Sequence, residues 1–164
     1  MGAGKIFCIL GGIVTLLACY LFSFGDFPLL PGAYFYGLGL FLNIGDVFGS
    51  GIALAIVFAI LGIILMFSGL LIILGVKSRA IGIIGSVFAI FMSVWFLLSF
   101  YMVFTGDLLL GVTVFVNLPL VEGIIPLHVG LGGSIFATVG LGTYLLLGGG
   151  VLGLIGGIMG PDDF

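Results

Sequence analysis

The sequence predicts an all-α integral membrane protein, a bundle of four transmembrane helices with both termini on the cytoplasmic side and two apolar outer loops that can contain short β-strands. Hydrophobic residues make up 63% of the chain and charged residues 5%, and no charged residue falls inside any of four long apolar stretches. A typical soluble domain carries about 25% charged residues. Because an ionised side chain at the bilayer centre costs at least about 2.5–3.5 kcal/mol, these stretches suit hydrocarbon rather than water.

The four apolar stretches divide the chain, which we interpret as a single tetraspan membrane domain over residues 1–164. A helix needs about 20 apolar residues to cross the hydrocarbon core. The predicted spans are residues 6–24, 52–76, 80–104 and 134–159. The predicted outer loops are residues 25–51 and 105–133.

Basic residues set the predicted orientation. The chain has three: Lys5 near the N-terminus, and Lys77 and Arg79 in the short loop between the second and third spans. Lysine and arginine near helix ends favour the cytoplasmic side. We therefore expect both termini inside, both long loops outside, and a multi-pass protein of the cell membrane.

The first span leaves one alternative open. Leu16-Leu17-Ala18-Cys19, after a lysine and an apolar run, matches the end of a bacterial lipoprotein signal, in which the cysteine becomes lipidated after cleavage. Leucine, alanine and cysteine are also ordinary residues of membrane helices. A spanning helix is the simpler interpretation.

The two halves of the chain share a pattern. Displacing the chain by 81 residues aligns a Tyr-x4-Gly-Asp motif at residues 20–26 with the same motif at residues 101–107. Tyrosine suits the aromatic belt at the membrane surface, and Gly-Asp suits a helix end that enters water. The pattern agrees either with an internal duplication or with convergence of two outward helix ends.

Glycine is concentrated in the fourth span, at spacings of four and seven residues that place it along one helix face. A glycine inside a helix costs about 1 kcal/mol relative to alanine, so a packing role is expected. Small residues at this spacing let two membrane helices approach closely. The predicted helix-packing residues are Gly142, Gly149, Gly153, Gly156 and Gly157. Their partner helix is either internal or part of a second copy.

The outer loops are unusually apolar. Pro28 and Pro31 argue against a continuous helix in the first loop, and the Val-rich run at residues 112–116 of the second has strand propensity. Strands from both loops would form a small cap, whose exposed edge can pair with a neighbour. The predicted partner-binding residues are Tyr34, Phe35, Tyr36, Phe41, Phe48, Val114 and Phe115.

The chain carries few groups for chemistry. His128 is the only histidine, and Glu122 lies six residues before it. A metal site usually takes three or four ligands, and the other outer candidates are Asp26, Asp46 and Asp107. We expect a solvated loop histidine, no metal, no cofactor and no enzymatic activity. The small net charge of −3 gives no reason to expect a nucleic-acid partner.

In topology the chain resembles claudins and tetraspanins, which have four spans, two outer loops and short cytoplasmic ends. Claudins carry a tryptophan and cysteine pattern in the first outer loop, and tetraspanins carry cysteines in the second. Here Cys8 and Cys19 lie in the first predicted span and Trp95 lies in the third. We therefore assign the chain to neither family.

The preferred hypothesis is a non-enzymatic tetraspan membrane protein that acts in assembly, by self-association or by scaffolding a membrane complex. Its partners would be membrane lipid and either further copies or other integral membrane subunits. One alternative is an accessory subunit of a larger respiratory or metal-containing membrane enzyme. Another is a passive pore or small-molecule carrier, lined by the few hydroxyls Ser68, Ser86, Ser93, Ser99, Thr138 and Thr143.

Overall fold

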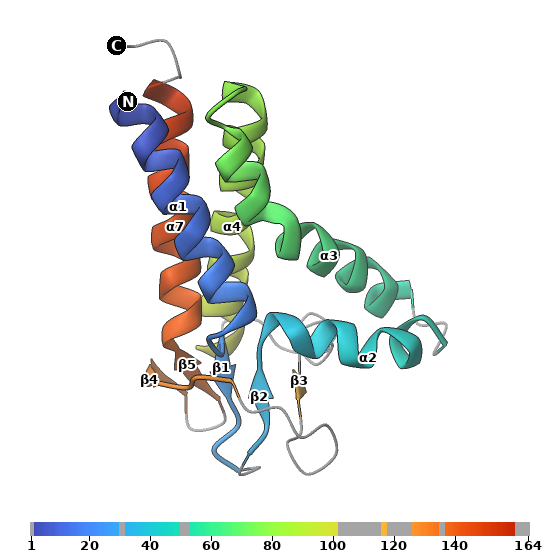
Figure 1. Cartoon of the computed structure of the whole chain (residues 1–164). Helices are drawn as coiled ribbons and strands as arrows, with labels where there is room; N and C mark the ends of the chain where they lie inside the picture. Colours follow the sequence, from blue (N-terminus) through green and yellow to red (C-terminus); the bar gives the residue numbers. More distant parts are fainter. Residues whose placement is uncertain are drawn as a thin grey trace.

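A computed structural model describes residues 2–29, 32–49, 53–101, 116–117, 126–134 and 137–159. These residues form five helices and a five-stranded antiparallel sheet (Figure 1). The helices are α1 (Ala3–Tyr20), α2 (Gly37–Gly49), α3 (Ala53–Leu74), α4 (Arg79–Phe100) and α7 (Leu141–Met159). The strands are β1 (Gly25–Asp26), β2 (Tyr34–Phe35), β3 (Val116–Asn117), β4 (Gly130–Gly133) and β5 (Thr138–Gly140).

Three helices, α1, α4 and α7, are long and apolar enough to cross a membrane. They correspond to the first, third and fourth predicted spans, and the prediction of a helical membrane protein is confirmed at this level. The second predicted span corresponds to α3, whose apolar part among the described residues, Ala59–Leu74, is shorter. The described residues therefore contain three candidate spans, and the predicted bundle of four transmembrane helices is reproduced only in part.

Four helices pack side by side. α7 contacts α1 and α4, and α3 also contacts both of them. Figure 1 shows that the second half of α3 lies along the bundle, whereas its first half runs away from α4 toward α2, which lies crosswise. Helices bend most readily where serine and glycine adjoin. α3 contains such a pair in Ser68-Gly69, and Ser68 Oγ donates to the carbonyl of Leu65 at 2.6 Å.

The start of α1, the end of α7 and the α3–α4 connection lie at one end of the bundle, and the sheet lies at the other (Figure 1). Lys5, Lys77 and Arg79 all belong to the first end. Arg79 Nε donates to the carbonyl of Gly157 at 3.3 Å, and Arg79 Nη2 donates to the carbonyl of Ile158. A cation there complements the dipole of α7. The grouping of basic residues agrees with the expected cytoplasmic end.

We call the sheet the outer cap; its strands lie in the order β3-β2-β1-β5-β4. All neighbouring strands are antiparallel, and Gly25 of β1 lies opposite both Phe35 of β2 and Val139 of β5. β1 and β2 come from the first predicted outer loop, and β3 and β4 come from the second. The prediction that the loops contain short strands is confirmed, although residues 112–115 of the Val-rich run lie outside the described residues.

Two boundaries differ from the prediction. α7 begins at Leu141 rather than at residue 134, because Thr138–Gly140 pair with β1 and β4 as strand β5. Gly133 before them has a φ of 133°, which glycine adopts readily and a helix does not allow. The first outer loop also contains the 13-residue helix α2. The sequence did not predict it, because the prolines that argue against a helix precede α2 instead of interrupting it.

An aromatic cluster joins the outer cap to the helices. Phe24 stacks on Phe96 of α4 with ring centroids 4.7 Å apart, and Phe35 of β2 meets Phe100 edge-on at 5.3 Å. These four side chains are at most 1% exposed. Aromatic pairs of this kind add about 0.5–1.5 kcal/mol beyond the apolar area that they bury. The cluster therefore fixes the cap on the helix ends.

Candidate functional site at the outer cap

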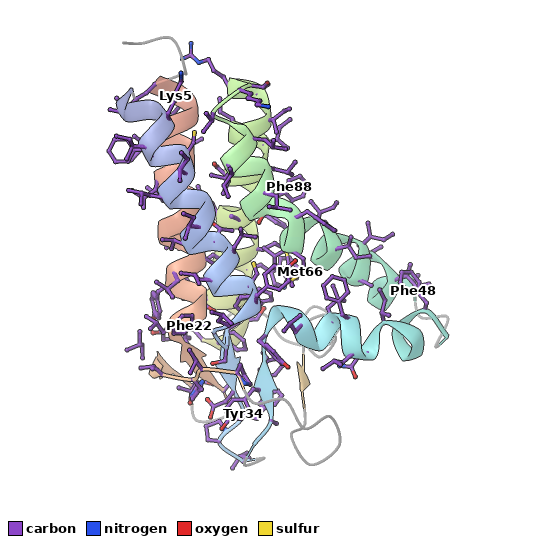
Figure 2. The ribbon with its side chains drawn as sticks, in the orientation of Figure 1. Lys5, Phe22, Tyr34, Phe48, Met66 and Phe88 are labelled. Atoms are coloured by element: carbon purple, nitrogen blue, oxygen red, sulfur yellow. The ribbon has the colours of Figure 1, made fainter. Side chains whose placement is uncertain are left out.

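A polar cluster lies within the outer cap. His128 Nδ1 lies 2.5 Å from Ser23 Oγ, and His128 Nε2 lies 3.6 Å from Asp26 Oδ1. The ring of Tyr34, at the cap end of the molecule in Figure 2, lies against the imidazole with centroids 5.3 Å apart. Ser23 is fully buried, whereas the side chains of His128 and Asp26 are 21% and 24% exposed. The imidazole and the carboxylate thus reach the surface, and the serine does not.

Backbone hydrogen bonds fix the position of His128. The preceding residue, Leu127, donates to the carbonyl of Leu21 at 2.8 Å and accepts from the N–H of Ser23 at 3.0 Å. The carbonyl that follows His128 accepts from the first N–H of α7 at 2.8 Å. His128 is therefore held between the end of α1 and the start of α7.

Ser23, His128 and Asp26 are the residue types of a hydrolytic triad, but their accessibility does not suit one. A serine nucleophile has to reach the carbonyl of its substrate, and Ser23 is 0% exposed. The hydrogen bond instead links two residues that are 105 positions apart. We interpret it as a structural crosslink between the first and second outer segments.

The cluster offers two adjoining side chains that ligate metals, His128 and Asp26. Protein metal sites usually take three or four ligands. Within the described part of the chain, no group of three or more His, Cys, Asp or Glu side chains is placed to hold a metal ion. The other predicted candidates, Asp46, Asp107 and Glu122, lie outside the described side chains.

Sequence reasoning missed this cluster. It treated His128 as a solvated loop residue, whereas the imidazole is mostly buried against Ser23 and Tyr34. The separation of 105 residues between Ser23 and His128 leaves no local spacing to recognise. The available signal was that His128 and Asp26 are ionisable residues in two loops predicted to form one cap.

The outer cap ends in an apolar edge. β4 is the last strand of the sheet, all four of its residues are exposed, and no further strand pairs with it in the described part of the chain. Leu127, Val129 and Leu131 are 59%, 48% and 51% exposed. Alternate residues of an extended segment share one face. Residues 127–133, which we call the β4 edge, therefore combine an apolar stripe with the open side of strand β4, although the backbone of Leu127 and the carbonyl of Val129 are hydrogen-bonded within the chain.

Part of the predicted partner-binding set belongs to the interior. Phe35 and Tyr36 are at most 1% exposed, and Tyr34 packs against His128. Phe35 and Tyr36 therefore lie in the interior of the outer cap, and Tyr34 is half-buried.

The remainder of that set divides between the surface and the undescribed segments. Phe41 and Phe48 lie on α2, and both are exposed; Phe48 is labelled at the far end of α2 in Figure 2. Val114 and Phe115 lie outside the described residues. Among the described members, α2 carries the residues that are available for contact.

The predicted glycine face of α7 packs first against α1. A Cβ atom on Gly149 would lie 2.5 Å from Thr15 Oγ1, and one on Gly156 would lie 2.7 Å from the backbone nitrogen of Cys8. Real Cβ atoms do not approach other atoms so closely. Glycine at these two positions lets the α1 and α7 backbones touch.

The other predicted glycines face different neighbours. A Cβ atom on Gly153 would lie 2.5 Å from Ile72 Cγ2 of α3, and one on Gly157 would lie 2.9 Å from Ile83 Cγ1 of α4. Gly142 packs against the backbone that precedes β1. All five glycines thus contact this chain itself, and their face of α7 is not open to a second copy.

Four of the six predicted hydroxyls also serve packing, whereas the buried Ser99 Oγ has no hydrogen-bond partner among the described residues. Ser93 Oγ donates to the carbonyl of Thr143 at 2.8 Å, and Thr143 Oγ1 donates to the carbonyl of Phe24 at 2.7 Å. Ser68 and Ser86 donate to carbonyls of their own helices. Hydroxyls occupied in this way do not line a water path, so these contacts favour helix packing over a pore.

An open groove of about 490 Å³ lies between α1 and α3. It is lined by Ile13, Leu16, Leu17, Tyr20, Leu21 and Leu70. Specific ligand sites combine apolar walls with a few placed polar groups. The tyrosine hydroxyl here lies 3.4 Å from the carbonyl of Met66, and the remaining lining is aliphatic, so the groove suits lipid chains in general.

These features define a helical membrane protein with an antiparallel cap at the end opposite its termini. Comparison of the chain with protein-family models, with curated proteins and with solved structures finds no match. Function is therefore inferred from the geometry of the chain itself.

Proposed function

We propose that this protein is a non-enzymatic tetraspan protein of the cell membrane that acts in assembly, by associating with further copies of itself. The observation that carries the proposal is the β4 edge, where the side of β4 that faces away from β5 meets no other strand in the described part of the chain and lies beside the exposed Leu127, Val129 and Leu131. A strand with free N–H and C=O groups is a template for pairing with another strand.

The β4 edge is unfavourable in either solvent when it is left uncovered. In water, its leucine and valine side chains lose the roughly 1.5–3 kcal/mol that full burial of each provides. In hydrocarbon, its backbone N–H and C=O groups lack hydrogen-bond partners. A second strand supplies the hydrogen bonds, and its own side chains cover part of the leucine and valine side chains beside them.

A second copy is the simplest partner for this edge. Copies in one membrane share an orientation, and a two-fold axis along the membrane normal brings identical edges together. Gly130, Gly132 and Gly133 leave little side-chain bulk to hold two backbones apart. One alternative contact surface, the glycine face of α7, is occupied within the chain.

The proposal includes α3 as a fourth membrane crossing. α1 and α4 both run from the end with the termini toward the outer cap, and α7 runs back (Figure 1). The chain must therefore return to the first end between α1 and α4. α3 makes that return, and it packs against both helices.

Leu131→Lys tests the β4 edge. A lysine on a sheet edge opposes strand pairing, and we expect it to weaken self-association at least about tenfold, because two like charges would meet in a symmetric contact. Förster transfer between donor- and acceptor-labelled copies in nanodiscs measures the association.

The matched control is Leu29→Lys. Leu29 is 69% exposed in the turn between β1 and β2, away from the β4 edge, and the same substitution there should leave association unchanged. Equal dissociation constants for the two variants would exclude the β4 edge as the contact.

A further inference from the structure

We propose that α2 and the first half of α3 form a hairpin that lies in the outer leaflet of the membrane and contacts its lipid directly. We define this α2–α3 hairpin as residues 37–49 and 53–64. Its partner is the boundary between the acyl chains and the headgroups of a phospholipid leaflet. The inference rests on the assignment of α1, α4 and α7 to the membrane and does not rest on self-association.

Tyrosines mark the level of the outer membrane surface. α1 ends at Tyr20, Tyr101 follows α4 directly, and Tyr144 lies in the first turn of α7. Tyrosine is enriched where membrane helices meet the headgroups. α2 begins at the same level, because a Cβ atom on Gly37 would overlap the carbonyl oxygen of Cys19. The hairpin therefore joins the bundle at the outer surface of the membrane.

The hairpin extends sideways from the bundle at this level. α2 contacts α3 and lies crosswise to the spans, with Phe48 at its far end (Figures 1 and 2). α2 has 13 residues, fewer than the roughly 20 that a crossing needs. Asp46 is the only charged residue between positions 27 and 76 of the sequence. A helix in the plane of the membrane surface keeps such a residue near water, whereas a crossing helix does not.

The surface of the hairpin is apolar. In α2, the side-chain amide of Asn43 donates to the carbonyl of Gly39 at 2.9 Å, so this polar group is satisfied within its own helix. Helices satisfy their backbone polar groups internally, which lets them enter a lipid leaflet. In water these side chains would form an apolar patch, whereas a helix in the membrane plane buries them among acyl chains. The large apolar side chains that the hairpin exposes among the described residues are Phe41, Leu42, Phe48, Val57 and Ile60.

The exposed side of α3 continues from the hairpin into the bundle. Phe67, Leu70 and Leu74 are exposed and follow Val57 and Ile60 at helical spacing. The second half of α3 packs along α1 and α4, so its exposed side faces the acyl chains that surround those spans. Because the apolar surface is continuous along α3, the side chains of the hairpin meet the same lipid. This continuity favours lipid over a protein partner.

Photolabelling of the native chain in nanodiscs tests the contact. The probe is a phosphatidylcholine with a diazirine near the carbonyl end of one acyl chain, which attaches on illumination to the residues beside it. Mass spectrometry should find adducts in α2 and in residues 53–60 at a yield comparable with that of α1, the positive control. Residues 25–29 of the outer cap should stay at the background yield. Adducts on α1 without adducts on the hairpin would overturn the proposal, and so would equal labelling of the cap, because the hairpin would then not lie at the membrane surface.

Nitroxide labels at matched positions separate lipid from water and from protein. In a Cys8→Ala, Cys19→Ala background, the label is attached at Phe48→Cys in the hairpin, at Leu70→Cys in the bundle or at Leu29→Cys in the cap. Oxygen dissolves in acyl chains, and its collisions should exceed those of a water-soluble nickel chelate at positions 48 and 70. The order should reverse at position 29. Nickel-dominated collisions at position 48 would place the hairpin in water, and low rates with both reagents would place it against protein. Either result would overturn the proposal.

Discussion

At the scale of single residues, glycines at particular positions of α7 allow this helix to pack closely against its neighbours. Gly149 is such a position, because a Cβ atom there would lie 2.5 Å from Thr15 Oγ1 and 2.8 Å from the carbonyl of Gly11. The adjacent Gly148 has no atom within 4 Å of its Cβ position. Sequence spacing alone identified a glycine-rich helix and the face with Gly149, but it gave no measure of how close each neighbour lies.

These two glycines make a matched pair of substitutions. Gly149→Ala should destabilise the protein by about 1–3 kcal/mol, because the clash involves backbone atoms that have no room to move. Gly148→Ala should be neutral or stabilising by up to about 1 kcal/mol, because alanine favours the helix and meets nothing. Unfolding midpoints in a denaturing-detergent titration measure both. Equal losses would show that the α1–α7 contact is not as close as described.

The polar cluster shows the limit of sequence reasoning at this scale. Hydrogen bonding joins Ser23 to His128 across 105 residues, and only folding of both outer segments brings them together. The composition showed that the segments outside the predicted spans contain few polar residues. It could not show which of these residues contact one another in the fold. By contrast, short strands in the two outer loops were predicted, although of the Val-rich run at residues 112–116 only Val116 belongs to a described strand.

At the scale of elements, hydropathy located α1 and α4 to within a few residues, since an apolar run and a helix end at the same water boundary. It placed the start of α7 seven residues early, because apolar residues such as Val139 serve strand β5 as well as they serve a helix. It missed α2 because Pro28 and Pro31 were given more weight than the apolar residues after them. Pairing of β5 with β1 and β4, which hydropathy does not report, decided where α7 begins.

The outer cap and the helices should unfold together, because buried aromatic rings join them. Phe96→Ala removes a fully buried ring that stacks on Phe24 at 4.7 Å and should cost about 3–5 kcal/mol. Phe91→Ala on the same helix removes a half-exposed ring whose aromatic contact is with Trp95, and should cost less than about 1.5 kcal/mol. Thermal unfolding, followed by cap and helix signals separately, gives the comparison. A cap that melts alone in Phe96→Ala would contradict the joint core.

At the scale of the whole molecule, the two ends have different characters. The end with the termini carries Lys5, Lys77 and Arg79, and Arg79 closes the last turn of α7. The opposite end carries the outer cap, with the hydrogen bond between Ser23 and His128 and the β4 edge. The glycine face of α7 is covered by contacts within the chain. We therefore assign assembly to the β4 edge.

The measurement that tests this assignment most directly is the mass and composition of the particle extracted by mild detergent from its native membrane. We expect a homogeneous multiple of 17.0 kDa, formed by this chain alone. A particle that contains one copy, or fixed amounts of other polypeptides, would contradict self-association. The second of these results would identify the chain as an accessory subunit.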